Sequence, residues 1–233
     1  MRRSWQRLLF AALLAAIFAP ARAAFAGGDL KATLAKLDEA AARFRTTRAD
    51  FEFDTVQTQP VPDTDVQKGV VYYKRSGSSF QMGVHIDSDN GQKMVKTIVC
   101  CEGGAVRLYE KALNQVTILH KLGQYESWFM LGFGAGGKEL AEKWEIADDG
   151  PETVNGVKTE KLEMIPKDPA VRRNLPKVTL WMDLERGISL KQHFDEGPGQ
   201  YRVAIYTNIK MNTAVPKDAF TIKTNKQTTY VNR

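Results

Sequence analysis

The sequence is poor in cysteine. Its 233 residues include two, the adjacent Cys100 and Cys101. Neighbouring α-carbons lie about 3.8 Å apart, which is shorter than the usual disulfide span, and neighbouring side chains on a strand point to opposite faces. A bridge between the two is therefore not expected, and without another pair the fold is not built on disulfides. We predict that both cysteines are packing residues.

The sequence also lacks an apolar run long enough to span a membrane. The run from Leu8 to Phe18 has eleven residues, whereas a spanning helix needs about twenty. This run follows three arginines and precedes two small-x-small sites, which is the pattern of a secretory signal peptide. We predict a signal peptide over residues 1–26, cleaved after Ala23 or Ala26.

Little positive charge remains once this leader is removed. Residues 1–26 contain four arginines and no acidic residue, so the formal net charge falls from +6 to +2. The charge of the whole chain is thus no evidence for a nucleic-acid partner. The remainder contains no Ser/Gly tract, charge block or repeat, and we predict one domain over residues 27–233.

Motifs that carry chemistry are scarce. The histidines His85, His120 and His193 lie far apart, and none forms a short-spaced metal pair. No Gly-x-Ser-x-Gly nucleophile elbow is present. Residues 132–137 match the Gly-x-Gly-x-x-Gly dinucleotide fingerprint, but their flanks do not fit a βαβ unit, so we interpret them as a flexible hinge. We predict no catalytic site, metal or cofactor.

Two segments have helical character. Asp29 is a typical N-cap residue. Apolar residues then recur at spacings of four and three, which places them on one helix face; they are Leu30, Leu34, Leu37, Ala41 and Phe44. A second helical segment is predicted over Lys138–Ala147. Both segments need an apolar surface on which to pack.

The rest of the chain has the period of two that indicates β-strands. About eleven strands are expected, mostly joined by short turns that favour antiparallel neighbours. They begin at Ala49 and then cover 66–75, 80–86, 94–101, 106–109, 115–120, 157–166, 178–183, 188–195, 201–211 and 220–223. In the long strand 201–211, alternate residues from Tyr201 to Met211 are expected to share one face. The alternation is compatible with an open sheet, a sandwich or a barrel, and does not choose among them.

With these elements in order, the chain resembles the periplasmic outer-membrane lipoprotein carrier proteins of the LolA type and their wider lipid-binding superfamily. The resemblance covers about residues 29–231, and the order and spacing of its stretches are more specific than any one stretch. The stretches are the opening helix running into Ala49–Phe53, Lys68–Arg75 followed by Phe80, the Gly104 turn with Leu108–Tyr109 and Leu113–Val116, and Tyr206–Asn212 followed by Phe220 and a short terminal strand.

The resemblance implies a mainly β (α+β) fold, a half-open antiparallel β-barrel with an N-terminal helix and a helical insert acting as a lid. It also implies a carrier that takes lipoproteins by their acyl chains from an inner-membrane exporter to an outer-membrane receptor. In the family's Lys-Arg-Pro run, the arginine ties the lid to the barrel wall. Arg75 matches this arginine, although Ser76 stands where the family has proline.

The residues expected to line the cavity or to face the lid are large and apolar. They are Phe51, Phe53, Val71, Tyr73, Phe80, Met82, Trp128, Phe129 and Met130, with Arg75 as the lid latch. On a regular strand Arg75 shares its face with Tyr73 and Val71, so it would project toward the apolar side and need acceptors from the lid. For residues 128–131, the pattern alone favours core packing over an adaptable binding surface.

Other functions stay open at the level of sequence. One is a periplasmic sensor of the same fold that binds a membrane anti-sigma factor, and another is a shuttle for free lipids. An exported enzyme is the third, which a cluster of histidines and carboxylates at a pocket mouth would favour. For the carrier we expect a periplasmic monomer without cofactor, metal or nucleic acid.

Overall fold

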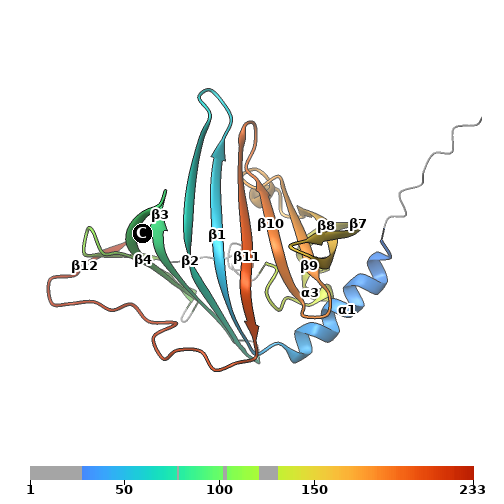
Figure 1. Ribbon diagram of the computed structural model, residues 1–233, viewed down its shortest axis with the longest axis horizontal. Helices are drawn as coiled ribbons and strands as arrows, with labels where there is room; N and C mark the ends of the chain where they lie inside the picture. The colour runs from blue at the N-terminus through green and yellow to red at the C-terminus, as the bar shows by residue number, and fades with distance from the viewer. Residues whose placement is uncertain (1–27, 78, 102–103, 121–130) are drawn as a thin grey trace, which may run out of the picture.

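The computed structural model describes residues 28–77, 79–101, 104–120 and 131–233 (Figure 1). The predicted signal peptide, residues 1–26, lies outside these ranges. Among the described residues, no helix combines the length and the apolar character that crossing a membrane requires.

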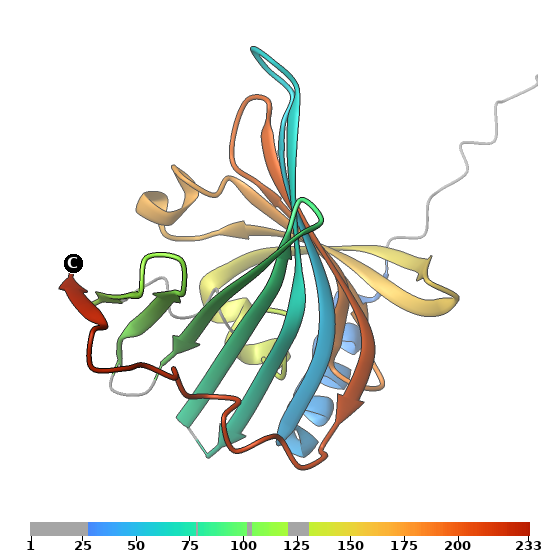
Figure 2. The ribbon, with the colours of Figure 1, turned by 60° about the vertical axis from the view of Figure 1, so that its left-hand side comes forward.

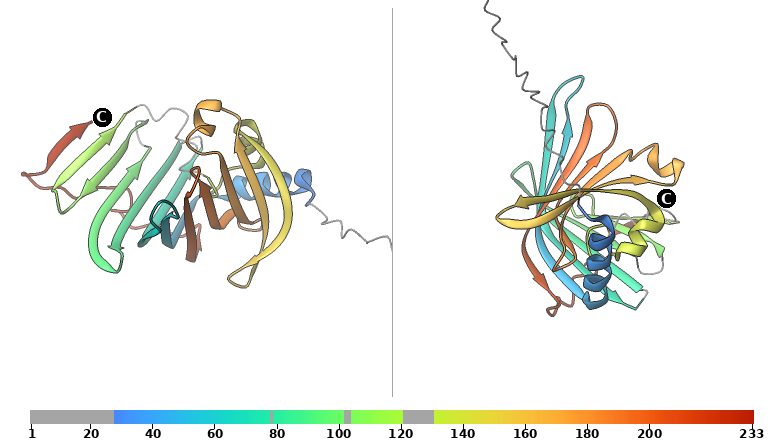
Figure 3. Two further views of the ribbon diagram at one scale, coloured as in Figure 1. Left: turned by 90° about the horizontal axis from the view of Figure 1, so that it is seen from above. Right: turned by 90° about the vertical axis from the view of Figure 1, so that its right-hand side faces the viewer.

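The strands of the described chain form one twelve-stranded sheet in the order β12-β6-β5-β4-β3-β2-β1-β11-β10-β9-β8-β7. Their bounds are β1 (Thr46–Gln57), β2 (Asp63–Ser76), β3 (Ser79–Asp89), β4 (Gln92–Cys100), β5 (Val106–Glu110), β6 (Gln115–Leu119), β7 (Trp144–Val154), β8 (Val157–Pro166), β9 (Lys177–Asp183), β10 (Ile188–Asp195), β11 (Gln200–Met211) and β12 (Thr229–Asn232). Neighbours are antiparallel except β12, which pairs with β6 in parallel. The sheet curls without closing, so β7 and β12 are its two edges (Figure 3). The predicted mainly β fold with an open antiparallel sheet is confirmed.

Two helices, α1 (Leu30–Arg43) and α3 (Gly137–Lys143), lie within the curve of the sheet, on its inner face (Figure 3). The short α4 (Pro169–Arg172) lies in the connection between β8 and β9. Asp29 is the N-cap of α1, as predicted, and its side chain accepts a hydrogen bond of 3.1 Å from the Ala32 amide. Helix α1 packs against α3 and β7, so the two helices cover one half of the inner face.

The inner face carries two clusters of buried side chains. One lies on β1 to β4 and includes Phe51, Tyr73 and Met82. The other lies under α1 and α3, where Leu37 of α1 meets inward side chains of β8 and β9. The inner face of the sheet is therefore apolar, as the alternation predicted, and each half of that face has its own core.

Strand β11 departs from the predicted alternation. Between Arg48 and Asp50 the register with β1 shifts, because Asn208 adopts a positive φ of 49° and adds a residue to β11. Tyr206 faces the inner side before this bulge, and Met211 faces it after the bulge. The prediction that alternate residues from Tyr201 to Met211 share one face is therefore wrong, because a bulge reverses the phase of a strand.

Two predicted segments differ from the structure. The helical segment ends at Lys143, and Trp144 begins β7, whose side chains pair with those of β8. Residues 220–223 form a turn and an extended segment rather than a strand. The carbonyl of Ala219, just before these residues, lies directly against Gly83 of β3. A Cβ on Gly83 would collide with it, so the glycine allows the C-terminal segment to pack on the strand.

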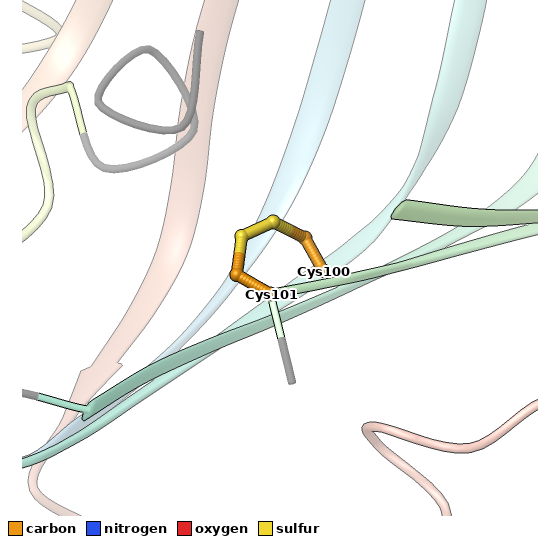
Figure 4. The surroundings of a disulfide bond; sticks show 2 residues. All are labelled: Cys100 and Cys101. Atoms are coloured by element: carbon orange, nitrogen blue, oxygen red, sulfur yellow. A yellow bond between two sulfur atoms is a disulfide. The ribbon is translucent and has the colours of Figure 1, made fainter. Parts of the chain in front are cut away.

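A disulfide joins Cys100 to Cys101 (Figure 4). The prediction that these neighbours stay unbridged is wrong, because it assumed a regular strand through both residues. Strand β4 ends at Cys100, the peptide between the two is cis, and their α-carbons lie 3.3 Å apart. Both residues are buried in the first core cluster, which agrees with the predicted packing role.

Candidate functional site

A cavity of about 300 Å³ lies on the inner face of the sheet, between the two cores. This volume is at the lower end of the range for ligand pockets. Most of its lining is apolar: Phe51, Phe53, Val71, Tyr73, Met82, Val84, Ile86, Ile98, Leu131, Leu175 and Phe194, with the polar residues Gln67, Gln192, Glu196, Arg202 and Tyr206. It is the candidate site because it is an apolar hollow that the side chains of the described residues do not fill.

The register of the central strands explains this lining. Val71 of β2 stands opposite Val84 of β3, and Val84 stands opposite Ile98 of β4. On β1, Phe51 and Phe53 are two residues apart and therefore point to the same face. Alternation along three paired strands thus brings a row of apolar side chains to one surface.

Most of the residues predicted for the cavity lie at or beside it. Five of them, Phe51, Phe53, Val71, Tyr73 and Met82, belong to the lining. Phe80 does not, but it is buried in the same core, with its ring centroid 5.6 Å from that of Tyr73. Trp128, Phe129 and Met130 lie outside the described residues.

The segment from Leu131 to Gly136, here called the insert, borders the cavity, and its Leu131 belongs to the lining. Its Phe133 is 1% exposed and stacks on Tyr73 with a centroid distance of 4.1 Å. The same ring meets Tyr206 edge-on at 4.7 Å. Burial raises the pKa of the Tyr73 and Tyr206 phenols, so both rings are neutral at physiological pH. Phe133 therefore occupies apolar space that lies next to the cavity.

Arg75 and Gln192 hold the insert in place. Arg75 donates a hydrogen bond to the carbonyl of Gly134, and its guanidinium lies 3.4 Å from the carboxylate of Glu139 in α3. From the other half of the sheet, Gln192 donates to the carbonyl of Leu131 at 2.7 Å and accepts from the Tyr206 hydroxyl at 3.2 Å. Nothing in the sequence points to Gln192, because a glutamine in a strand pattern gives no signal of its partner across the sheet.

Glycines allow the insert to approach its neighbours closely. Gly134 has a φ of +72°, and a Cβ on it would come within 2.6 Å of the Phe44 ring. A Cβ on Gly137 would collide with the backbone of Leu34 in α1. The structure thus assigns these glycines to close packing rather than to the flexible hinge that the sequence suggested.

The polar lining residues do not form a recognisable reaction centre. Gln67, Glu196 and Arg202 lie toward the hairpin ends of β2 and β11, whereas Gln192 and Tyr206 bind each other beside the insert. Across the described ranges, no group of three or more His, Cys, Asp or Glu side chains could hold a metal ion. The arrangement is suited to enclosing an apolar group.

Known proteins resemble this chain more in fold than in sequence. No family model matches the chain. An uncharacterized protein of Methanocaldococcus jannaschii is 28% identical over 123 residues, and the match covers 53% of this chain. The chain spans about a third, 34%, of that relative's length.

Among solved structures, MucB matches 84% of this chain at 14% identity with a TM-score of 0.50, and the match covers 63% of MucB. The chain has the fold of the matched part of MucB. A LolA superfamily protein from Nitrosomonas europaea is also similar, at 15% identity and a TM-score of 0.39 over 83% of this chain and 97% of that protein. At such identities the likeness is one of fold alone. The architecture that the LolA-type resemblance implied, an open antiparallel sheet with an N-terminal helix, agrees with the structure.

Proposed function

We propose that this protein is an exported carrier that holds acyl chains in the inner-face cavity and ferries them across the periplasm. In this proposal lipoproteins pass from an inner-membrane exporter to an outer-membrane receptor, and free lipid is the alternative cargo. The observation that carries the proposal is the cavity itself, an apolar hollow of about 300 Å³ between two cores. The role is one of binding, without a chemical step.

A curved sheet with an apolar inner face can shield the hydrocarbon of such a cargo from water. Each CH₂ group moved out of water contributes about 0.8 kcal/mol, so an acyl chain needs a continuous apolar surface. A sheet supplies this surface while its own backbone groups remain hydrogen-bonded. Release needs a cover that can detach. The insert is held by side-chain bonds from Arg75 and Gln192, and its backbone also pairs with the start of β10 through two hydrogen bonds.

A matched pair of variants on β4 tests the proposal. Ile98 lines the cavity, whereas Val95 is 43% exposed and three residues away, on the opposite face of the strand. The full chain with its leader is expressed and purified from the periplasm, and bound material is identified by mass spectrometry. We expect acylated material with the unaltered protein and with Val95→Asp, and about a tenfold loss with Ile98→Asp, because a carboxylate in the cavity opposes hydrocarbon. Equal loading of both variants would refute cavity binding.

A regulatory role is the second candidate. The fold is that of MucB, and the MucB of Pseudomonas aeruginosa has been solved in a complex with MucA. In that role the chain would bind a membrane protein and sense acylated ligands rather than transport them. Recovery of one stoichiometric protein partner, without acylated material, would favour this candidate over the carrier.

A further inference from the structure

The cavity has a polar end that the carrier proposal does not explain. Three lining residues form it: Gln67 of β2, Glu196 in the turn after β10, and Arg202 of β11. Arg202 stands opposite Phe194 on β10 and opposite Thr55 on β1. The polar end thus lies just beyond the apolar lining, toward the hairpin tips of β1–β2 and β10–β11.

This end is far from the Arg75 contact with the insert. Gln67 and Arg75 are on the same strand, eight residues apart, which corresponds to about 26 Å along a β-strand. Near the Arg75 end the inner face is closed by Phe133 stacked on Tyr73. The cavity therefore has a closed apolar end and a polar end, which is the shape that an amphiphile requires.

The Arg202 guanidinium has N–H donors to spare at the polar end. The guanidinium of Arg202 donates from Nε to Glu196 Oε2 at 3.0 Å, and its Nη2 lies 2.6 Å from Glu196 Oε1. Both carboxylate oxygens are engaged, while a guanidinium has five N–H donors and keeps those that Glu196 does not use. The Arg202 side chain is also the more exposed partner, at 44% against 22% for Glu196. An added anion therefore finds free N–H donors here, on the more exposed of the two partners.

We propose that Arg202 binds the anionic head group, a carboxylate or a phosphate, of a single-chain amphiphile whose tail lies in the cavity. The inference rests on the proposed function, because it assumes that an acyl chain enters this site. We take the tail to be a single chain, because about 300 Å³ corresponds to about ten water molecules at liquid density. Guanidinium is the side chain best matched to carboxylate and phosphate, through paired hydrogen bonds.

The test separates tail binding from head-group binding. The neutral fluorophore N-phenyl-1-naphthylamine reports an apolar site, and decanoate, decyl phosphate and decan-1-ol are compared as displacing ligands. With the unaltered protein, we expect decanoate or decyl phosphate to displace the fluorophore at about a tenfold lower concentration than decan-1-ol, since a charge-assisted hydrogen bond acts only on the anions. Whichever anion is the tighter ligand identifies the source of the head group.

Three variants test whether Arg202 is the source of the preference for anions. Arg202→Gln should weaken the anions about tenfold, leave decan-1-ol unchanged and abolish the preference, while Arg202→Lys should restore part of it. Arg48→Gln is the matched control, because Arg48 pairs with Asp50 on the outer face of β1 and does not line the cavity. If Arg202→Gln retains the full anion preference, the head-group inference is wrong although the tail site stands. If no ligand displaces the fluorophore, the carrier proposal fails together with the inference.

Discussion

Arg75 connects two distant parts of the chain through one side chain. It stands on β2 and reaches the insert at Gly134 and helix α3 at Glu139, which lie 59 and 64 residues further along the chain. The side chain is 26% exposed, so each contact is worth less than a fully buried one. Arg75 therefore adds a side-chain contact to an insert whose backbone is also bonded to the start of β10.

Replacement of Arg75 by leucine should loosen the insert without unfolding the sheet. We expect amide hydrogen exchange over residues 131–143 to speed up about fivefold, corresponding to about 1 kcal/mol, because the carbonyl of Gly134 loses its donor. Lipid loading or release should change in parallel. Arg107→Leu removes an exposed arginine from β5 and serves as the control. Unaltered exchange, loading and transfer in Arg75→Leu would rule out the latch.

Phe133 contributes apolar packing, whereas Arg75 contributes a polar contact. Its ring fills space that an apolar ligand could use. Phe133→Ala should lower the free energy of unfolding by about 3–5 kcal/mol, the usual cost of emptying a buried aromatic site. The enlarged cavity should nevertheless bind N-phenyl-1-naphthylamine more tightly, because apolar cavities accept apolar guests. Phe220→Ala, in the segment that crosses β3, is the control and should leave the affinity as it is. An unaltered affinity in Phe133→Ala would show that the ring does not border the ligand site.

At the scale of elements, α1 is attached to the edge of the sheet by a carboxylate pair. Thr33 of α1 donates to Asp148 of β7 at 2.7 Å, and Glu160 of β8 lies beside Asp148. Burial raises the pKa of Glu160 above its ordinary value of 4.5, and the hydrogen bond and charge of Asp148 raise it further, while Lys158 and Lys36 lower it. Protonated Glu160 therefore fits this site better than the ionised form.

The stability of this attachment should fall with rising pH. Because the pKa of Glu160 is raised in the folded state, its contribution is complete below pH 4.5 and is lost as the pH rises through the folded-state value. Glu160→Gln should remove this dependence and increase the free energy of unfolding at pH 7 by about 0.5–1 kcal/mol. Urea unfolding at several pH values measures both effects. Glu152→Gln, an exposed carboxylate on β7, is the control; the same pH profile in both variants would contradict the assignment.

At the scale of the whole molecule, the C-terminal segment covers the outer face of one half of the sheet. It leaves β11, crosses strands β1 to β5 and ends as β12 on the far edge (Figure 2). His85 contacts the Ala219 carbonyl at 3.0 Å, and Thr228 donates to Asn114 at 2.9 Å. Val99 and Val116, which the alternation places on this outer face, are 5% and 1% exposed. A single sheet would leave them in water, so the crossing segment provides their cover.

Deletion of residues 213–233 should therefore cost about 3–6 kcal/mol, the value of burying two large apolar side chains. We expect a lower urea midpoint and new light scattering, because an exposed apolar patch promotes association. Deletion of residues 229–233 alone removes β12 and keeps the crossing segment. Equal losses in the two deletions would show that β12, and not the crossing segment, protects this face.

The sequence by itself determined what depends on local periodicity. The N-cap at Asp29, the paired faces of Phe51 and Phe53, and the inward position of Arg75 all follow from helix and strand geometry. The tertiary structure alone decided that a bulge at Asn208 reverses the face of β11. It also brought Gln192, Glu196 and Arg202 to the cavity. The reason is physical: alternation sets the face of a residue within its strand, whereas curvature, bulges and contacts across the sheet arise only when distant segments pack together.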